Sequence, residues 1–313
     1  MTEARAPLFR DPVYDGAADP VVIWNRDEQA WWLLYTNRRA NVPCEGFAWV
    51  HGTDIGIASS KDGGRTWAYR GVLQGLEFER GRNTFWAPEI LWHGGLYHMY
   101  VSYVPGIPVD WRTTRHIIHM TSKNLWDWQF ESRLNLSSDK VIDACIYRMS
   151  DQTWRMWYKD EANGSHTYMA ESKDLYTWDV KGPVITDCAH EGPNVFFWQG
   201  YYWMITDPWK GLAVYRSSDV TNWEKQGYIL DTPGKRKDDK TNGLHADVVV
   251  QGGRAFIFYF THPDRVRAER VEEEHPYSSK RTSIQVAELE VRDGVLYCDR
   301  DKPFHFELLT GEG

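Results

Sequence analysis

The chain has 313 residues, of which 42 % are hydrophobic and 26 % are charged, a balance typical of soluble globular proteins. Its 36 basic and 44 acidic side chains give a net charge of −8, which argues against nucleic acid or an anionic membrane as a partner. No apolar run approaches the roughly 18 residues that a membrane-spanning helix requires.

Short runs of β-branched and aromatic residues, separated by Gly, Asn and Asp turns, follow one another along the chain without a sustained helical period. In chain order they predict five successive sheets. The expected strands are 18–24, 31–36, 54–58 and 67–70 in the first sheet; 86–92, 96–101 and 116–120 in the second; 141–146, 154–158 and 167–170 in the third; 191–197, 201–205 and 212–215 in the fourth; and 245–250, 255–260 and 284–289 in the fifth.

A short motif recurs four times, at 60–67, 122–128, 172–178 and 218–223. Each copy has Ser, then Asp or Asn, then a Trp, and the final Trp residues are 45 to 61 positions apart, close to the length of a four-stranded propeller blade. The Asp or Asn can bond the backbone ahead of it, while the Trp starts the next strand and packs between blades. We therefore expect residues 1–313 to form a single all-β domain, a five-bladed β-propeller of four-stranded antiparallel sheets.

Two charged runs, 234–240 and 264–280, interrupt the pattern. Such runs are usually solvated loops. The alternatives are that the first forms a rim over an axial pocket, since it directly precedes the inner strand of the fifth sheet, and that the second contacts a neighbouring subunit in a homo-oligomer.

Ionisable residues stand at the start of four of the five expected inner strands, where a propeller brings strands together at one end of its channel. They are Asp19, Asp143, Glu191 and His245, and in the second sheet Glu89 follows deeper on the same face. Any one of these acids alone is best explained as a solvated turn residue. Three together are not, because converging buried carboxylates repel one another and raise a pKa.

Several motifs together resemble the family 43 glycoside hydrolases, over residues 11–299. They are Ala-Asp-Pro at 18–20, Trp-Ala-Pro-Glu at 86–89, Ile-Asp at 142–143, Glu-Gly-Pro at 191–193 and the Ser-x-Asp-Leu-x-x-Trp turn at 172–178. The resemblance implies an inverting hydrolase, with Asp19 as general base, Glu191 as general acid, and Asp143 tuning and orienting that acid. Inverting hydrolysis needs such a pair about 6.5–9.5 Å apart, one group activating water and the other protonating the leaving oxygen.

The chain departs from the family pattern at three places. Glu89 stands where Asp is frequent, Ala144 where Pro commonly follows the Asp, and His190 directly precedes Glu191. The related 3,6-anhydro-L-galactosidases use a His as acid and have a strand similar to Tyr-Thr-Asn-Arg at 35–38. The alternative acids to Glu191 are therefore His190 and His245.

Sugar contacts are expected from Trp86, by stacking, and from Asn37 and Arg38 at a strand end. Arg38 and Arg39 could instead recognise a carboxylate or neutralise the channel acids. Further candidates lie at expected strand-to-loop junctions: His51, Asp54, Arg115, His116, Lys159, Asp207 and Trp209.

We expect no required cofactor. His245 resembles the family histidine that faces a metal or a water cluster, and a neutral histidine bonded within the pore is the alternative. One histidine does not define a metal site, but an oxygen-rich calcium or sodium site reached through ordered water stays open.

We expect an exo-acting hydrolase that acts on oligosaccharides, and the resemblance implies that the terminal sugar it releases is arabinofuranose or xylose. One alternative is a 3,6-anhydro-L-galactosidase or another hydrolase of an unusual sugar. A non-catalytic carbohydrate-binding propeller is another, although it has no use for the three acids. A further alternative is a glycoside phosphorylase, which would need several basic groups around a phosphate pocket. The candidates for these groups are Arg38, Arg39, Arg115 and Lys159. The absence of a signal core at the N-terminus and the scattered cysteines predict a cytoplasmic protein.

Overall fold

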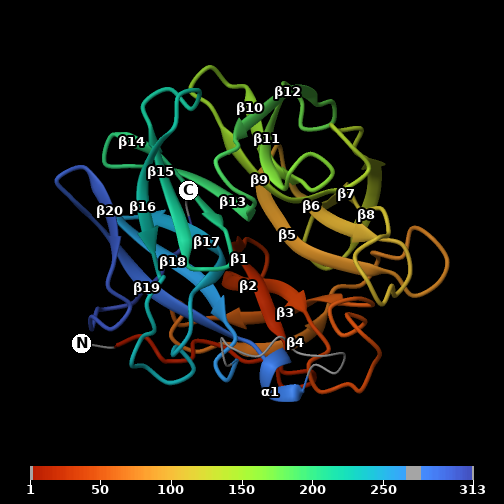
Figure 1. Cartoon of the computed structure of the whole chain (residues 1–313), viewed down its shortest axis with the longest axis horizontal. Coiled ribbons are helices and arrows are strands. Elements are labelled where there is room, and N and C mark those ends of the chain that lie inside the picture. Colours follow the sequence, from red (N-terminus) through yellow and green to blue (C-terminus); the bar gives the residue numbers. More distant parts are fainter. Residues whose placement is uncertain (1–2, 266–275, 312–313) are drawn as a thin grey trace.

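The computed structural model describes residues 3–265 and 276–311, and in these the chain forms five four-stranded antiparallel sheets around one axis (Figure 1). The sheets are β1(Ala17–Asn25), β2(Ala30–Asn37), β3(Asp54–Ser60), β4(Ala68–Val72); β5(Thr84–His93), β6(Leu96–Val104), β7(His116–Ser122), β8(Trp128–Arg133); β9(Val141–Arg148), β10(Trp154–Asp160), β11(His166–Ser172), β12(Asp179–Ile185); β13(Glu191–Trp198), β14(Tyr201–Asp207), β15(Leu212–Ser217), β16(Glu224–Ile229); and β17(Leu244–Gln251), β18(Arg254–Thr261), β19(Ser283–Arg292), β20(Val295–Cys298). The predicted all-β five-bladed propeller is confirmed.

Every expected strand coincides with or overlaps an observed one. The strands without expected bounds are the outermost of the second to fifth sheets, β8, β12, β16 and β20. Three of these edge strands, β8, β12 and β16, are partly exposed and carry no apolar run, and β20 is only four residues long, so the sequence pattern does not mark them. The only helix among the described residues is the single turn α1(Tyr277–Lys280), and no helix there is long and apolar enough to cross a membrane.

The repeated motif forms the turn that its residues predict. In the third copy, the Oδ1 of Asp174 accepts hydrogen bonds from the backbone N–H groups of Tyr176 and Thr177 at 2.8 and 2.7 Å. The tryptophan that follows starts or directly precedes an outer strand and packs into the core between two blades. The prediction that it packs between blades is therefore confirmed.

The hydrophobic core is divided into five main clusters, one at each interface between neighbouring blades. The ring closes where β17 lies beside β1, and the first and last sheets exchange no strand there. Residues near both ends of the chain, Phe9 with Phe304 and Phe306, pack into this closing interface. Side-chain packing across the interface therefore holds the ring closed.

A β-bulge interrupts the pairing of every inner strand where it reaches the axis. Four of these bulges contain a residue with positive φ: Asp19 at 49°, Ala87 at 41°, Asp143 at 59° and Gly192 at 56°. A bulge turns a strand locally and re-aims its side chains. In three of the four, the next residue is proline, which has no N–H to leave unpaired. The bulges thus direct the strand starts into the channel.

The second charged run lies partly outside the described residues, because 266–275 are not described. Its contact with a neighbouring subunit therefore stays a prediction. All four cysteines are free, in agreement with the expected reduced thiols.

Candidate active site

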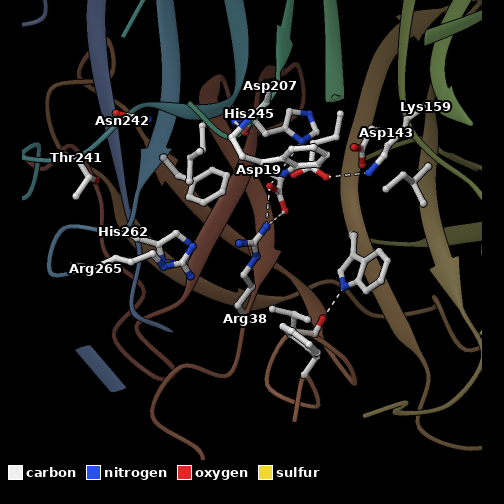
Figure 2. Close-up of a pocket in the computed structure, with 18 of the residues that line it drawn as sticks. Asp19, Arg38, Asp143, Lys159, Asp207, Thr241, Asn242, His245, His262 and Arg265 are labelled. Carbon is white, nitrogen blue, oxygen red and sulfur yellow. Dashed lines mark hydrogen bonds and ion pairs between the residues drawn. The ribbon is translucent and has the colours of Figure 1, made fainter. Parts of the chain in front are cut away.

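A pocket of about 730 Å³ lies at the axis, and the starts of the inner strands line it (Figure 2). The structure brings together Asp19 of β1, Asp143 of β9, Glu191 of β13 and His245 of β17, as their positions predicted. The volume falls within the range of small-molecule sites. Of the other candidates, Trp86, Arg38, Lys159, Asp207 and Trp209 also line this pocket.

Asp19 is nearly buried and is held by Arg38 and His245. Both of its carboxylate oxygens accept hydrogen bonds from Nη2 of Arg38 at 3.1 Å (Figure 2). Nδ1 of His245 lies 3.6 Å from Oδ1 of Asp19. The guanidinium of Arg38 also lies 4.7 Å from the centre of the Phe260 ring, and this contact helps to fix it. Asp19 is therefore oriented from two sides.

Asp143 is fixed by its backbone as well as its side chain. Its N–H donates to Oγ of Ser102 at 2.9 Å, and its Oδ2 accepts from the N–H of Gly192 at 3.1 Å, next to Glu191. Burial raises the pKa of Asp143 to about 6; the charges of His245 and Lys159 oppose this rise, and Glu191 adds to it.

Glu191 belongs to a chain of ion pairs at the pocket. Its Oε2 lies 3.1 Å from Nζ of Lys159, and this ammonium also contacts Oε1 of Glu161 at 2.9 Å. Glu161 in turn pairs with Arg115 at 2.8 Å. Burial disfavours the charge of Lys159, but the adjacent glutamates raise its pKa above the ordinary value. Lys159 is thus a fixed cation in contact with the expected acid.

Asp207 is a further carboxyl group at the pocket, and it connects two blades. Its Oδ2 accepts from the N–H of His245 at 2.9 Å and its Oδ1 from the N–H of Trp209 at 2.7 Å. Burial, with a contribution from Glu191, raises the pKa of Asp207 to about 7. His245 itself is crowded by carboxylates; although burial opposes its charge, these groups raise its pKa above the usual value.

Three candidates lie behind the pocket wall. His51 is fully buried; burial lowers its pKa to about 4, its Nδ1–H donates to the carbonyl of Phe47 at 2.9 Å, and its ring lies 5.0 Å from that of Trp86. Asn37 is buried in β2 and is not among the pocket-lining residues. Glu89 lies deeper in the channel, as expected, where its Oε1 accepts from the N–H of Ile146 at 2.7 Å. Burial and nearby Asp247 raise its pKa well above the ordinary value.

Other candidates lie away from the pocket. His190 is fully buried, with Nδ1 and Nε2 bonded to the carbonyl of Cys188 and the hydroxyl of Thr167 at 2.8 and 2.6 Å. It therefore cannot reach a leaving group as it stands. His116, Asp54, Arg39 and Arg115 are also outside the pocket lining, so the four basic groups of the phosphorylase hypothesis are not brought together.

Much of the pocket wall comes from loops that the motif search did not mark. Phe47, Trp49 and Val50 come from the connection between β2 and β3, and Trp111 from that between β6 and β7. These two loops pair, since the N–H of Phe47 donates to the carbonyl of Val109 at 2.9 Å. Their length and aromatic content are the sequence signal for this wall.

The remaining wall lies beside the fifth blade. Lys240 and Thr241 line the pocket at the end of the first charged run, in agreement with the expected rim. His262 and Arg265 line the same side as Thr241 in Figure 2.

The residues around His245 do not form a preassembled cage of metal ligands. Among the described residues, one group of three metal-ligand side chains lies close enough to share an ion, Asp187, Cys188 and His190, and it does not include His245. In that group, the carboxylate of Asp187 is already bonded to Lys225 and Tyr215. The channel ion therefore stays a prediction.

No family model and no curated protein matches this chain, but solved structures share its fold. A thermostable family-43 glycoside hydrolase is 21 % identical, with a TM-score of 0.65 over 93 % of this chain and 95 % of that one. A GH43 β-xylosidase/α-arabinofuranosidase from a compost microbial metagenome, in complex with xylotriose, is 15 % identical, with a TM-score of 0.68 over 94 % and 96 %. A GH43 β-1,3-galactosidase with galactodeoxynojirimycin is 15 % identical, with a TM-score of 0.68 over 94 % and 97 %. At these identities, the likeness shows that the chain has the propeller fold of those structures.

Proposed function

We propose that the protein is an exo-acting inverting glycoside hydrolase. The observation that carries this proposal is the convergence of Asp19, Asp143 and Glu191, from three separate blades, on one pocket at the axis. Burying three carboxyl groups together lowers stability, so a purely structural pore would not use them. The glycosidases among the solved structures with this fold support the same reaction class.

In this mechanism, Asp19 is the base. Arg38 and His245 hold its carboxylate in one orientation, from which it would remove a proton from water as that water attacks the anomeric carbon. Glu191 would protonate the leaving oxygen from the other side. Inversion requires a separation of about 6.5–9.5 Å between the two carboxyl groups, which leaves room for the water.

Lys159 and Asp143 both act on the proposed acid, Glu191, the first at its side chain and the second through the adjacent backbone. Lys159 contacts Glu191 directly, whereas Asp143 bonds the backbone N–H of the residue after it. Because the pKa of Asp143 is about 6, this group changes charge close to neutral pH, beside the acid. His245 is the alternative acid, since it also carries a proton near the pocket centre.

Two substitutions test these assignments. Asp19→Asn keeps the shape but removes the base, so turnover should fall to below a few per cent of wild type with an unchanged melting temperature; higher retained activity would refute the assigned base. Glu191→Gln should reduce hydrolysis of poor leaving groups far more than that of activated aryl glycosides. An equal loss on both would transfer the acid role to His245.

The substrate proposed is a short oligosaccharide with a terminal arabinofuranose or xylose. Two of the three solved structures named above are described with a sugar or a sugar analogue, xylotriose in one case. A panel of aryl glycosides and oligosaccharides, with the product anomer read by NMR, tests both sugar and inversion. Release of the retained anomer would overturn the mechanism. The panel includes 3,6-anhydro-L-galactosides, which test the alternative sugar.

A further inference from the structure

The turn between β14 and β15 places a tryptophan at the pocket in an unfavourable backbone conformation. Trp209 lines the pocket, its φ is 59°, and 49 % of its surface is exposed. The left-handed region is rarely adopted by a bulky residue, and glycine would occupy it without strain. Such strain is concentrated at functional sites, where the side chain itself is used.

Buried Asp207 holds this conformation. One of its oxygens accepts the N–H of Trp209 at 2.7 Å, and the other accepts the N–H of His245, on the inner strand of the next blade, at 2.9 Å. The turn is therefore tied to the channel wall. A large aromatic ring in a fixed position binds a ligand with little loss of conformational freedom.

Lys159 places the ring next to Glu191. Its Nζ lies 5.2 Å from the centre of the Trp209 ring and 3.1 Å from Oε2 of Glu191. The group that protonates a leaving oxygen must lie toward the leaving group. The exposed part of the indole is thus on the leaving-group side. Trp86 differs, because it is 7 % exposed and its indole N–H donates to the carbonyl of Val50 at 2.6 Å.

We propose that Trp209 forms a sugar-binding subsite for the leaving group, on which the second ring of an oligosaccharide stacks with its apolar face. The proposal rests on the proposed function, because Glu191 as acid defines the leaving-group side. It names the substrate class more closely: the group released is itself a sugar, and a simple alkyl alcohol would leave the ring uncovered.

The test uses two substrates with the same terminal sugar, a trisaccharide and the corresponding glycosyl fluoride. Fluoride has no ring to stack. Trp209→Gly should lower kcat/KM for the trisaccharide by about tenfold or more and leave that for the fluoride within about threefold. Because glycine relieves the backbone, the melting temperature should not fall. A loss of equal size on both substrates, or no loss on the trisaccharide, would overturn the proposal.

Gln199→Gly is the matched control. Gln199 has φ of 50° and lies exposed in the turn at the opposite end of the same β13–β14–β15 sheet. The substitution relieves the same kind of backbone strain at a residue that does not line the pocket. The kcat/KM values for the trisaccharide and for the fluoride should therefore stay as in wild type.

Binding is measured separately by calorimetry with xylotriose and arabinotriose in the Asp19→Asn background. If the wild-type protein hydrolyses neither xylotriose nor arabinotriose, the proposed function fails. The binding result still decides whether Trp209 forms a sugar-binding subsite. A weaker affinity after Trp209→Gly supports the subsite. An unchanged affinity, or no binding of either sugar, overturns it.

Discussion

Replacing Asp143 by Asn should stabilise the folded protein at alkaline pH while removing a group of the proposed mechanism. Its pKa is about 6 against an ordinary 3.8, because the side chain is buried, so the folded state holds a proton that the unfolded chain has lost. The contribution of this carboxyl is therefore favourable below pH 4 and is lost as the pH rises through 6. Above pH 7, the raised pKa of Asp143 lowers the free energy of unfolding by about 3 kcal/mol relative to a carboxyl group with the ordinary pKa.

Asn removes this penalty at little structural cost. Asp143 has φ of 59°, a conformation that Asn tolerates well, and the amide oxygen can still accept the N–H of Gly192. Thermal unfolding of both proteins at pH 4 and pH 8 measures the effect. We expect nearly equal melting temperatures at pH 4 and an advantage of about 5 °C for the variant at pH 8.

The control is Asp179→Asn, because the side chain of Asp179 is 76 % exposed on an outer strand, and its substitution should change neither curve. A variant of Asp143 that is less stable than wild type at pH 8, or equally displaced at both pH values, would refute the reasoning.

Two other perturbations follow from the structure. Gly192 has φ of 56°, and Gly192→Ala would place a Cβ 2.6 Å from Cδ2 of His245. This variant should lose most of the activity and about 2–5 kcal/mol of the free energy of unfolding measured with denaturant. In the control Gly94→Ala, φ is 60° and no atom lies near the new Cβ, so the loss should be only about 1–2 kcal/mol. If the two variants were equally stable, the close approach to His245 would be wrong. Burial lowers the pKa of His119 to about 3, so the folded protein cannot take up the proton that the unfolded chain binds below pH 6.5. The stability that this neutral histidine contributes at pH 7 is therefore lost on acidification. His119→Gln should reduce the loss of unfolding free energy between pH 7 and pH 5 by about 2 kcal/mol. An unchanged loss would mean that His119 ionises normally.

The fold could be predicted because its signals are local. The turn around Asp174 needs only an acceptor oxygen and the two amides after it, and the inner strands carry long apolar runs. The outer strands could not be delimited, because a partly exposed edge strand such as β12 mixes charged, apolar, Gly and Pro residues and is defined by its partner β11. Pairing of that kind is not visible in one stretch of sequence.

The site could be predicted only for residues fixed by strand position. Asp19 and Asp143 occupy the same bulge position in the first and third blades, and Glu191 directly precedes that position in the fourth, so the repeat itself brings them together. Asp207 is marked by its place at the end of a strand, whereas Trp111 reaches the pocket through the path of its loop, which has no repeat to reveal it. His190 shows the converse, since its neighbour in sequence faces the pocket while its own ring is bonded to Thr167.

The bulges explain why acids, rather than apolar residues, occupy the ends of the inner strands. A regular strand would alternate its side chains between the two faces of a blade, and those faces are filled by the clusters between blades. A left-handed residue breaks the alternation and turns one side chain along the axis instead. At Asp19 and Asp143 the side chain in that position lines the pocket, where it can carry a charge, at a cost in backbone strain. The bulges leave the apolar packing between blades intact, and this packing stabilises the fold enough to offset the strain. Function and stability are therefore separated within these inner strands. We expect substitutions of the Asp19 and Asp143 side chains to change activity with less effect on folding than substitutions of the buried apolar residues deeper in the same strands.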